Sequence, residues 1–157
     1  MRDCIQRKSK ISEHTNISKD EEDVCIFCKI VNGEVGCYKI WEDEDFLAFL
    51  DAFPSMKGQV LVIPKKHIAP WVFNMEDREY CDFMLAAKRV VRAVDKAMKP
   101  LKTGLMVEGL ELEHVHIKIF PLSKIGFRDY PKKLDPLPSK GEMEEMAKVI
   151  RDISKNI

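Results

Sequence analysis

The stretch HVHIKIFP, residues 114–121, decides the fold, because apolar residues recur at every second position within it. An alternation with period two is typical of a β-strand that buries one face. We therefore predict a strand whose apolar face points into the core, formed by Val115, Ile117 and Ile119. The opposite face then carries four larger side chains: His114, His116, Lys118 and Phe120. The proline at position 121 predicts that pairing stops there.

Two imidazoles and an ammonium aligned on one face of a strand serve no purpose in packing. Neighbours on that face lie roughly 6.5–7 Å apart, close enough to act on one ligand. This pattern favours a site that binds or reacts. The alternative is an exposed edge strand whose polar side chains face water.

The composition limits the classes of function. The 157 residues predict one domain with a substantial core, and 26 basic residues balance 26 acidic ones. A net charge of zero argues against binding to duplex DNA or RNA and to anionic membranes. No apolar run approaches the ~20 residues of a membrane span, and no signal peptide is evident. Five cysteines, two of them in a C-x-x-C, indicate a reducing compartment, so we expect a cytoplasmic protein.

The chain is expected to contain a tail and a single domain. Residues 1–22 are polar and charged without sustained apolar periodicity, so a flexible tail is predicted there. His14 lies in this tail and is interpreted as a solvated side chain. Residues 23–157 form the predicted domain.

The domain opens with a short helix that Asp23 caps and that carries Cys25 and Cys28 on one side. Thiolates at positions i and i+3 suit tetrahedral zinc, but one C-x-x-C supplies only half of a site. Two reduced thiols without a metal are one alternative. A thioredoxin-like redox pair is another, although such a motif should follow a strand.

The remaining periodicities predict an α+β fold with an antiparallel meander sheet. The predicted strands cover residues 38–41, 46–50, 59–63 and 104–107, in addition to the strand that bears His114. One long helix, residues 75–98, is capped by Asn74 and closed by Pro100. An irregular loop, 123–138, precedes an amphipathic C-terminal helix, 141–153, which packs on its own domain or on a partner subunit.

Four segments in this order resemble the histidine triad (HIT) family over residues 24–122. These are CIFCKIVNGEV, FLAFLD, VLVIPKKHI and HVHIK, with a long helix between the last two. The family consists mostly of small homodimeric enzymes that transfer or hydrolyse nucleotidyl groups. The resemblance therefore implies a HIT-like homodimer, with its sheet extended across a two-fold axis, and a nucleotide or nucleotide derivative as substrate.

The resemblance also implies roles for individual residues. His116 matches the nucleophile that attacks the α-phosphorus and forms a nucleotidyl-histidine intermediate. Asp51 matches the residue that binds the ribose hydroxyls, and the base pocket corresponds to Phe27, Ile30 and Phe49. Family members with this C-x-x-C hold structural zinc, and the matching ligands here are Cys25, Cys28, His67 and His114.

Two departures from the family pattern concern the phosphate region. Residues 107–113 lack the Gly-Gln-Ser-like segment that contacts the phosphate in many members, and this loop is shorter. Lys118 stands where the third histidine would be. A cation there disfavours the imidazolium form of His116 and offers a positive donor to the developing phosphorane charge. Alternatively, Lys118 reaches solvent and the site only binds.

The sequence therefore predicts a nucleotidyl hydrolase or transferase that uses His116 and Lys118 in catalysis. Its substrate would be a nucleoside phosphoramidate or a dinucleoside polyphosphate. The competing hypothesis is a zinc-stabilised nucleotide-binding module without turnover. A non-catalytic scaffold is a third hypothesis, for which only the tail and the C-terminal helix argue.

Overall fold

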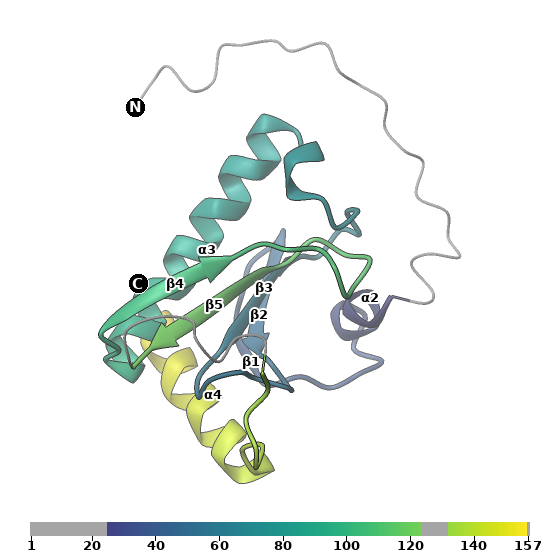
Figure 1. The fold of residues 1–157 in the computed structure, drawn as a ribbon. Helices are drawn as coiled ribbons and strands as arrows, with labels where there is room; N and C mark the ends of the chain where they lie inside the picture. Colours follow the sequence, from purple (N-terminus) through teal and green to yellow (C-terminus); the bar gives the residue numbers. More distant parts are fainter. Residues whose placement is uncertain (1–24, 124–131, 157) are drawn as a thin grey trace.

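The computed structural model describes residues 25–123 and 132–156, which contain a five-stranded antiparallel sheet between helices (Figure 1). The strands are β1 (Lys39–Glu42), β2 (Phe46–Leu50), β3 (Val60–Pro64), β4 (Lys102–Met106) and β5 (Ile117–Leu122), in the spatial order β1-β2-β3-β5-β4. The first three strands form the predicted meander, and β5 then pairs with both β3 and β4. The α+β prediction is confirmed. The predicted tail lies outside the described residues, as do residues 124–131 of the predicted loop.

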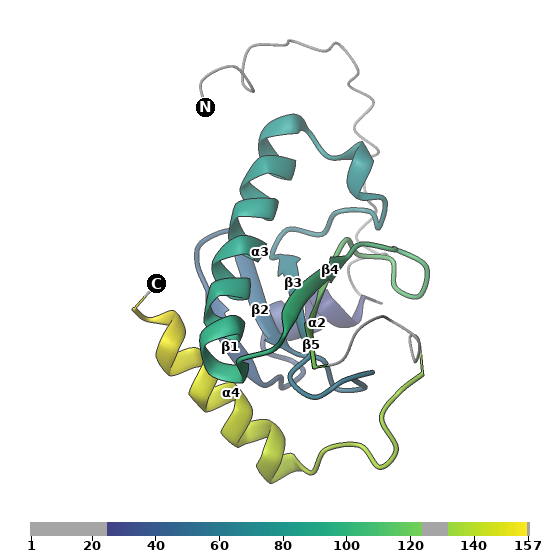
Figure 2. The same ribbon diagram turned by 60° about the vertical axis from the view of Figure 1, so that its left-hand side comes forward.

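The helices cover both faces of this sheet. They are α2 (Ile26–Val31), the 3-10 turn η2 (Val72–Asn74), α3 (Asp77–Met98) and α4 (Lys140–Ser154). Figures 1 and 2 show α3 and α4 on one face and the short α2 on the other. The central strands are therefore covered from both sides.

Coverage on both faces explains why β2 and β3 are apolar at every position. Alternate residues, such as Ala48 and Val62, join the core under α3 and α4. The residues between them, such as Phe49 and Leu61, pack in a smaller cluster with Phe27 of α2. In β5, Ile117 and Ile119 belong to the larger core, so Lys118 points to the α2 face.

The strand around the histidines differs from the prediction at both ends. Its ladder begins at Ile117, so His114 and His116 precede it. The prediction that pairing stops at Pro121 was wrong, because Pro121 lies opposite Thr103 of β4 and the strand continues to Leu122. Pairing of β5 with β3 ends at Ile119, so the missing N–H of Pro121 removes no hydrogen bond to β3.

Helix α3 starts later than predicted and ends as predicted. Asn74 belongs to η2, and Glu76 occupies the N-cap position without a side-chain cap. Acidic residues in the first turn, Asp77 and Glu79, interact favourably with the positive end of the helix dipole. At the other end Lys99 adopts a left-handed conformation, with φ of 48°, directly before Pro100.

Helix α4 packs on its own domain, which decides between the two predicted alternatives. Ser139 and Glu142 form a capping box at its start. Its buried side chains join the larger core, and Ser154 donates a hydrogen bond to the Ile40 carbonyl of β1 at 3.2 Å. Within the described ranges, no helix is long and apolar enough to cross a membrane.

Candidate functional site

Four potential metal ligands converge between α2 and the sheet. Cys25 and Cys28 come from the start of α2, His67 follows β3, and His114 precedes β5. Their ligand atoms all lie within 4.8 Å of one another. The predicted cap of α2, Asp23, lies outside the described residues, and Cys25 itself occupies the N-cap position.

The separations of these atoms fit a tetrahedral ion. The Sγ of Cys28 lies 3.1 Å from Nδ1 of His67 and 3.7 Å from Nδ1 of His114, and the Sγ of Cys25 lies 3.4 Å from Nδ1 of His114. Zinc with ordinary Zn–S and Zn–N bonds would hold sulfur and nitrogen about 3.6 Å apart. The donor set is therefore spaced to close around one ion.

His114 is held in the tautomer that a ligand requires. Its Nε2 lies 3.0 Å from the carbonyl oxygen of Pro64, so Nε2–H donates and the lone pair of Nδ1 faces the thiols. Burial is the main cause that lowers the pKa of His114; the hydrogen bond to Pro64 opposes it and the neighbouring His67 and His116 add to it, with a net pKa of about 4. The imidazole is thus neutral near pH 7.

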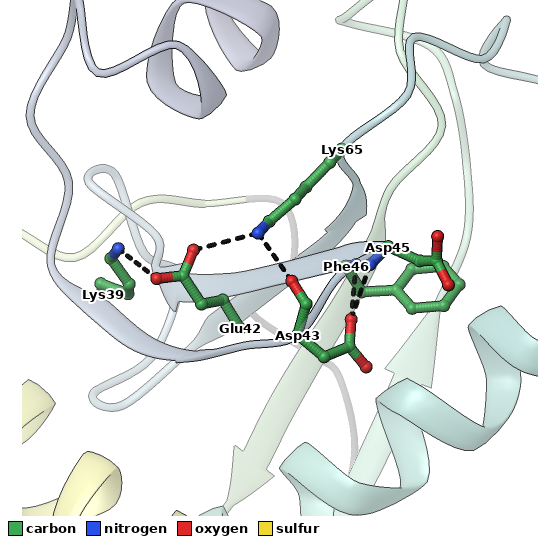
Figure 3. A network of polar contacts seen from close by, with 6 residues as sticks. All are labelled: Lys39, Glu42, Asp43, Asp45, Phe46 and Lys65. Carbon is green, nitrogen blue, oxygen red and sulfur yellow. Dashed lines mark hydrogen bonds and ion pairs between the residues drawn. The ribbon is translucent and has the colours of Figure 1, made fainter.

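A polar network anchors the segment that supplies Pro64 and His67 (Figure 3). Nζ of Lys65 donates to the Asp43 carbonyl at 2.6 Å and pairs with Glu42 at 3.2 Å. The backbone N–H of Lys65 donates to the Asp45 carbonyl at 2.7 Å. The end of β3 is thereby tied to the β1–β2 turn, which helps to place the Pro64 carbonyl and His67.

His116 presents an unpaired nitrogen. Its Nδ1–H donates to the backbone carbonyl of His114 at 2.9 Å, so Nε2 carries the lone pair. This Nε2 is buried and has no hydrogen-bond partner in the described part of the chain. Burial lowers the pKa of His116 and the Lys118 charge adds to this effect, whereas Glu108 and Asp51 oppose it. The neutral imidazole is the form that can act as a nucleophile.

A cavity of about 420 Å³ opens beside His116. Its volume lies within the range of small-molecule sites. The sequence-predicted residues that line it are Phe27, Ile30, Phe49, Asp51, His116 and Lys118. The rings of Phe27 and His116 meet edge to face, with centroids 5.4 Å apart. The fold thus gathers every candidate binding and catalytic residue around one cavity, next to the candidate metal ligands.

Asp51 is oriented by a residue that sequence reasoning missed. Its Oδ1 accepts the backbone N–H of Phe53 at 2.8 Å, and its Oδ2 accepts Nε2–H of Gln59 at 2.6 Å. Gln59 is buried and accepts the N–H of Ser55 through its own Oε1 at 2.8 Å. The only signal in the sequence was a polar residue at the start of an apolar strand.

The alternative in which Lys118 reaches solvent is wrong. Its side chain is 11% exposed and forms an ion pair with Glu108, whose side chain is 16% exposed. Glu108 was not recognised from the sequence, because it lies ten residues away in an irregular loop. Lys133 was also missed: it lines the cavity, with its Nζ 4.8 Å from the ring centroid of Phe53.

Comparison with known proteins places this arrangement in a family. The pattern described as the HIT domain matches residues 32–125, more than half of the chain. The chain belongs to the histidine triad (HIT) family. This match covers His67, His114 and His116, whereas Cys25, Cys28 and Lys133 lie outside it.

Several HIT relatives cover most of the chain. An adenosine 5'-monophosphoramidase of Schizosaccharomyces pombe is 34% identical over 125 residues, 75% of this chain and 93% of that protein. An uncharacterized HIT-like protein of Methanocaldococcus jannaschii is 41% identical over 102 residues, 62% of this chain and 78% of that protein. Among solved structures, a hypothetical histidine triad nucleotide-binding protein of Sulfolobus tokodaii aligns with a TM-score of 0.74 at 30% identity, covering 84% of this chain and 93% of that one.

Proposed function

We propose that this HIT protein is a nucleotidyl hydrolase or transferase that works through a covalent intermediate on His116. The observation that carries the proposal is Nε2 of His116, a buried lone pair without a hydrogen-bond partner among the described residues, at the wall of the cavity. A buried polar atom without a partner is costly unless a ligand uses it. Attack on phosphorus is a use that fits a neutral imidazole.

In this mechanism each group has one task. The Nε2 lone pair forms a bond to the α-phosphorus, and the electron pair of the phosphorus–leaving-group bond departs with the leaving group. Water then attacks the phosphorus, the N–P electron pair returns to Nε2, and a proton is released to solvent. The Nδ1–H bond to the His114 carbonyl holds the tautomer throughout.

Substrate binding is assigned to the rest of the cavity. Asp51 accepts hydrogen bonds from the ribose hydroxyls, since each carboxylate oxygen can accept more than one. The base packs among Phe27, Ile30 and Phe49, which are apolar lining residues. Lys118 contributes positive charge near the phosphoryl oxygens. A nucleoside phosphoramidate, the class of substrate named for the Schizosaccharomyces pombe relative, and a dinucleoside polyphosphate are the two candidate substrates of this site.

We further propose that Cys25, Cys28, His67 and His114 hold one structural zinc ion, for which their spacing and the tautomer of His114 are suited. Two thiolates and two imidazoles are a closed ligand set, so the metal supplies cross-linking and no reaction step. It would join α2 to the segments after β3 and before β5. Because the His114 carbonyl also orients His116, this cross-link supports the nucleophile.

The protein is proposed to act as a homodimer in a reducing, cytoplasmic environment. Strand β4 ends the sheet, and an isologous contact there would cover an unpaired edge. Leu105 of β4 and Leu101 directly before it are exposed in the single chain, as is Leu85 of α3. Neither duplex nucleic acid nor a membrane is proposed as a partner.

The second candidate function is a zinc-stabilised nucleotide-binding module without turnover. The pairing of Lys118 with Glu108 favours it, because a carboxylate partner reduces the net charge available to a transition state. Both candidates share the metal centre and the cavity, and they differ in whether His116 becomes modified.

Mass spectrometry of the intact protein separates the two functions. The wild type is incubated with a panel of dinucleotides and nucleoside phosphoramidates, quenched in denaturant and weighed. We expect a nucleotidyl adduct in the wild type and in His14→Ala, a matched histidine control, and none in His116→Ala. His116→Ala should retain nucleotide binding while losing turnover by several orders of magnitude. Binding without adduct or turnover in any case would leave the binding module as the function.

A further inference from the structure

Lys118, which lines the cavity, forms an ion pair with Glu108. Lys118 follows His116 by two residues and lines the cavity, while Glu108 comes from the segment after β4. Both side chains are largely withdrawn from solvent. A charge pair in such surroundings is screened much less than a surface pair, so Glu108 constrains where the ammonium lies.

The backbone beside Glu108 is also constrained. Gly109 has a φ of 64°, a left-handed conformation that other residues rarely adopt. A Cβ at this position would lie 2.6 Å from the carbonyl oxygen of Pro70. The close approach of these two backbone segments requires glycine, and it helps to fix the residue that precedes it.

The pair differs chemically from a histidine at the same place. A histidine ionises near neutral pH and can donate a proton, because efficient proton donors have a pKa near the working pH. A lysine ammonium ordinarily loses its proton only near pH 10.4, and a neighbouring carboxylate favours the charged form. Its ion pair with Glu108 therefore suits Lys118 to supply charge, and not a transferable proton.

Among the described residues that line the cavity, no second imidazole takes the place of that proton donor. His116 is the only imidazole among the described lining residues, and it is assigned to nucleophilic attack. The carboxylate of Asp51 already accepts hydrogen bonds from Phe53 and Gln59. A leaving group that needs a proton therefore has no second imidazole among the described lining residues to supply it.

We propose that Glu108 is a positioning residue that holds the ammonium of Lys118 toward the phosphoryl group, and that this pair selects leaving groups able to depart as anions. The inference rests on the proposed function. When Nε2 of His116 bonds to phosphorus, the electron pair of the breaking bond stays on the leaving group. A phosphate or a phenolate is stable with that charge, whereas an amine would have to leave as a strongly basic anion.

The test measures how the first chemical step depends on the leaving group. The substrates are adenosine 5'-phosphate aryl esters whose phenols span a range of acidity, together with one adenosine phosphoramidate. The readout is the rate of the phenol or amine burst in a single turnover of the full chain. For the wild type, the rate should fall by a factor of roughly 5 to 10 for each rise of one in the pKa of the phenol, as Brønsted behaviour without proton donation predicts. The phosphoramidate should react more slowly than every ester.

Three variants test the two residues separately. Lys118→His restores an ionisable imidazole, so its rates should depend less steeply on the phenol, and cleavage of the phosphoramidate should rise relative to the wild type. Glu108→Gln removes the charge of the carboxylate that pairs with Lys118, so kcat should fall roughly 10- to 100-fold with KM nearly unchanged. Glu108→Asp should recover part of that loss. Equal thermal melting of the three variants shows that they are folded.

Each outcome bears on a different statement. A burst whose rate is insensitive to the phenol in the wild type would overturn the selectivity of the site. A Glu108→Gln variant with wild-type kcat would overturn the positioning role. If the wild type gave no burst with any ester or with the phosphoramidate, and no adduct, the proposed function itself would fall and this inference with it.

Discussion

Acidification of the metal-free protein should destabilise it through His114. In the folded state burial lowers the pKa of His114 to about 4, from an ordinary value of 6.5. As pH falls below 6.5 the unfolded chain binds the proton first, so the stabilisation is complete above that pH and is lost as pH falls toward 4. A difference of one in pKa corresponds to about 1.4 kcal/mol, so this residue accounts for a loss of about 3 kcal/mol in the free energy of unfolding. His116, whose pKa is also lowered, acts in the same direction.

Urea denaturation of chelator-treated protein, repeated from about pH 7.5 to about pH 4, measures this loss. His114→Asn removes the titrating group, while its side-chain amide still offers a donor to the Pro64 carbonyl. The variant should be less stable at neutral pH, and its stability should depend less on pH by about 3 kcal/mol over the range. His14→Asn, a change in the N-terminal segment, should behave as the wild type.

The three proteins are compared by how much the free energy of unfolding changes with pH, and not by their stability at one pH. Other groups that titrate in this range are present in all three proteins, so their contributions cancel. Equal pH dependence in the wild type and His114→Asn would refute the argument that His114 is buried as a neutral imidazole. In zinc-loaded protein, acid should also release the metal, since protons and metal compete for Nδ1.

Three further predictions concern the metal, the assembly and the cavity. Purified protein should contain about one zinc per chain. Chelation should lower its melting temperature, because structural zinc contributes on the order of 10 kcal/mol in small domains. Protein that is purified without zinc and whose melting temperature does not change with chelator would contradict this. Light scattering at micromolar concentration should give the mass of a dimer, and Leu105→Asp on β4 should shift it to a monomer, whereas a monomeric wild type would rule the dimer out. Gln59→Leu should weaken nucleotide binding roughly tenfold, because Asp51 loses the hydrogen bond that orients it, and should change kcat little. Calorimetry measures the affinity and steady-state kinetics measure kcat. Unchanged affinity would mean that Gln59 does not orient Asp51.

Local sequence patterns predicted most of the strands and helices. Strand β2 was predicted with its observed bounds, and β1, β3 and α3 within two residues at each end, because their apolar runs and the proline after α3 act over a few neighbouring residues. The candidate metal ligands are far apart in the chain, and spacing alone supplied only the two cysteines. The other two came from resemblance, and the structure brings all four within 4.8 Å.

The sequence by itself determined which elements form and which residue types gather on the face of His116. It did not determine how the polar partners pair, because an ion pair between residues 108 and 118 or a hydrogen bond between 51 and 59 leaves no periodic trace in a single chain. Only the tertiary structure decided that α4 packs on its own domain, that Lys118 pairs with Glu108, and that His116 lines the cavity while its buried Nε2 has no hydrogen-bond partner among the described residues. The physical reason is that burial and hydrogen bonding depend on distance in space, which the fold sets and the local pattern does not.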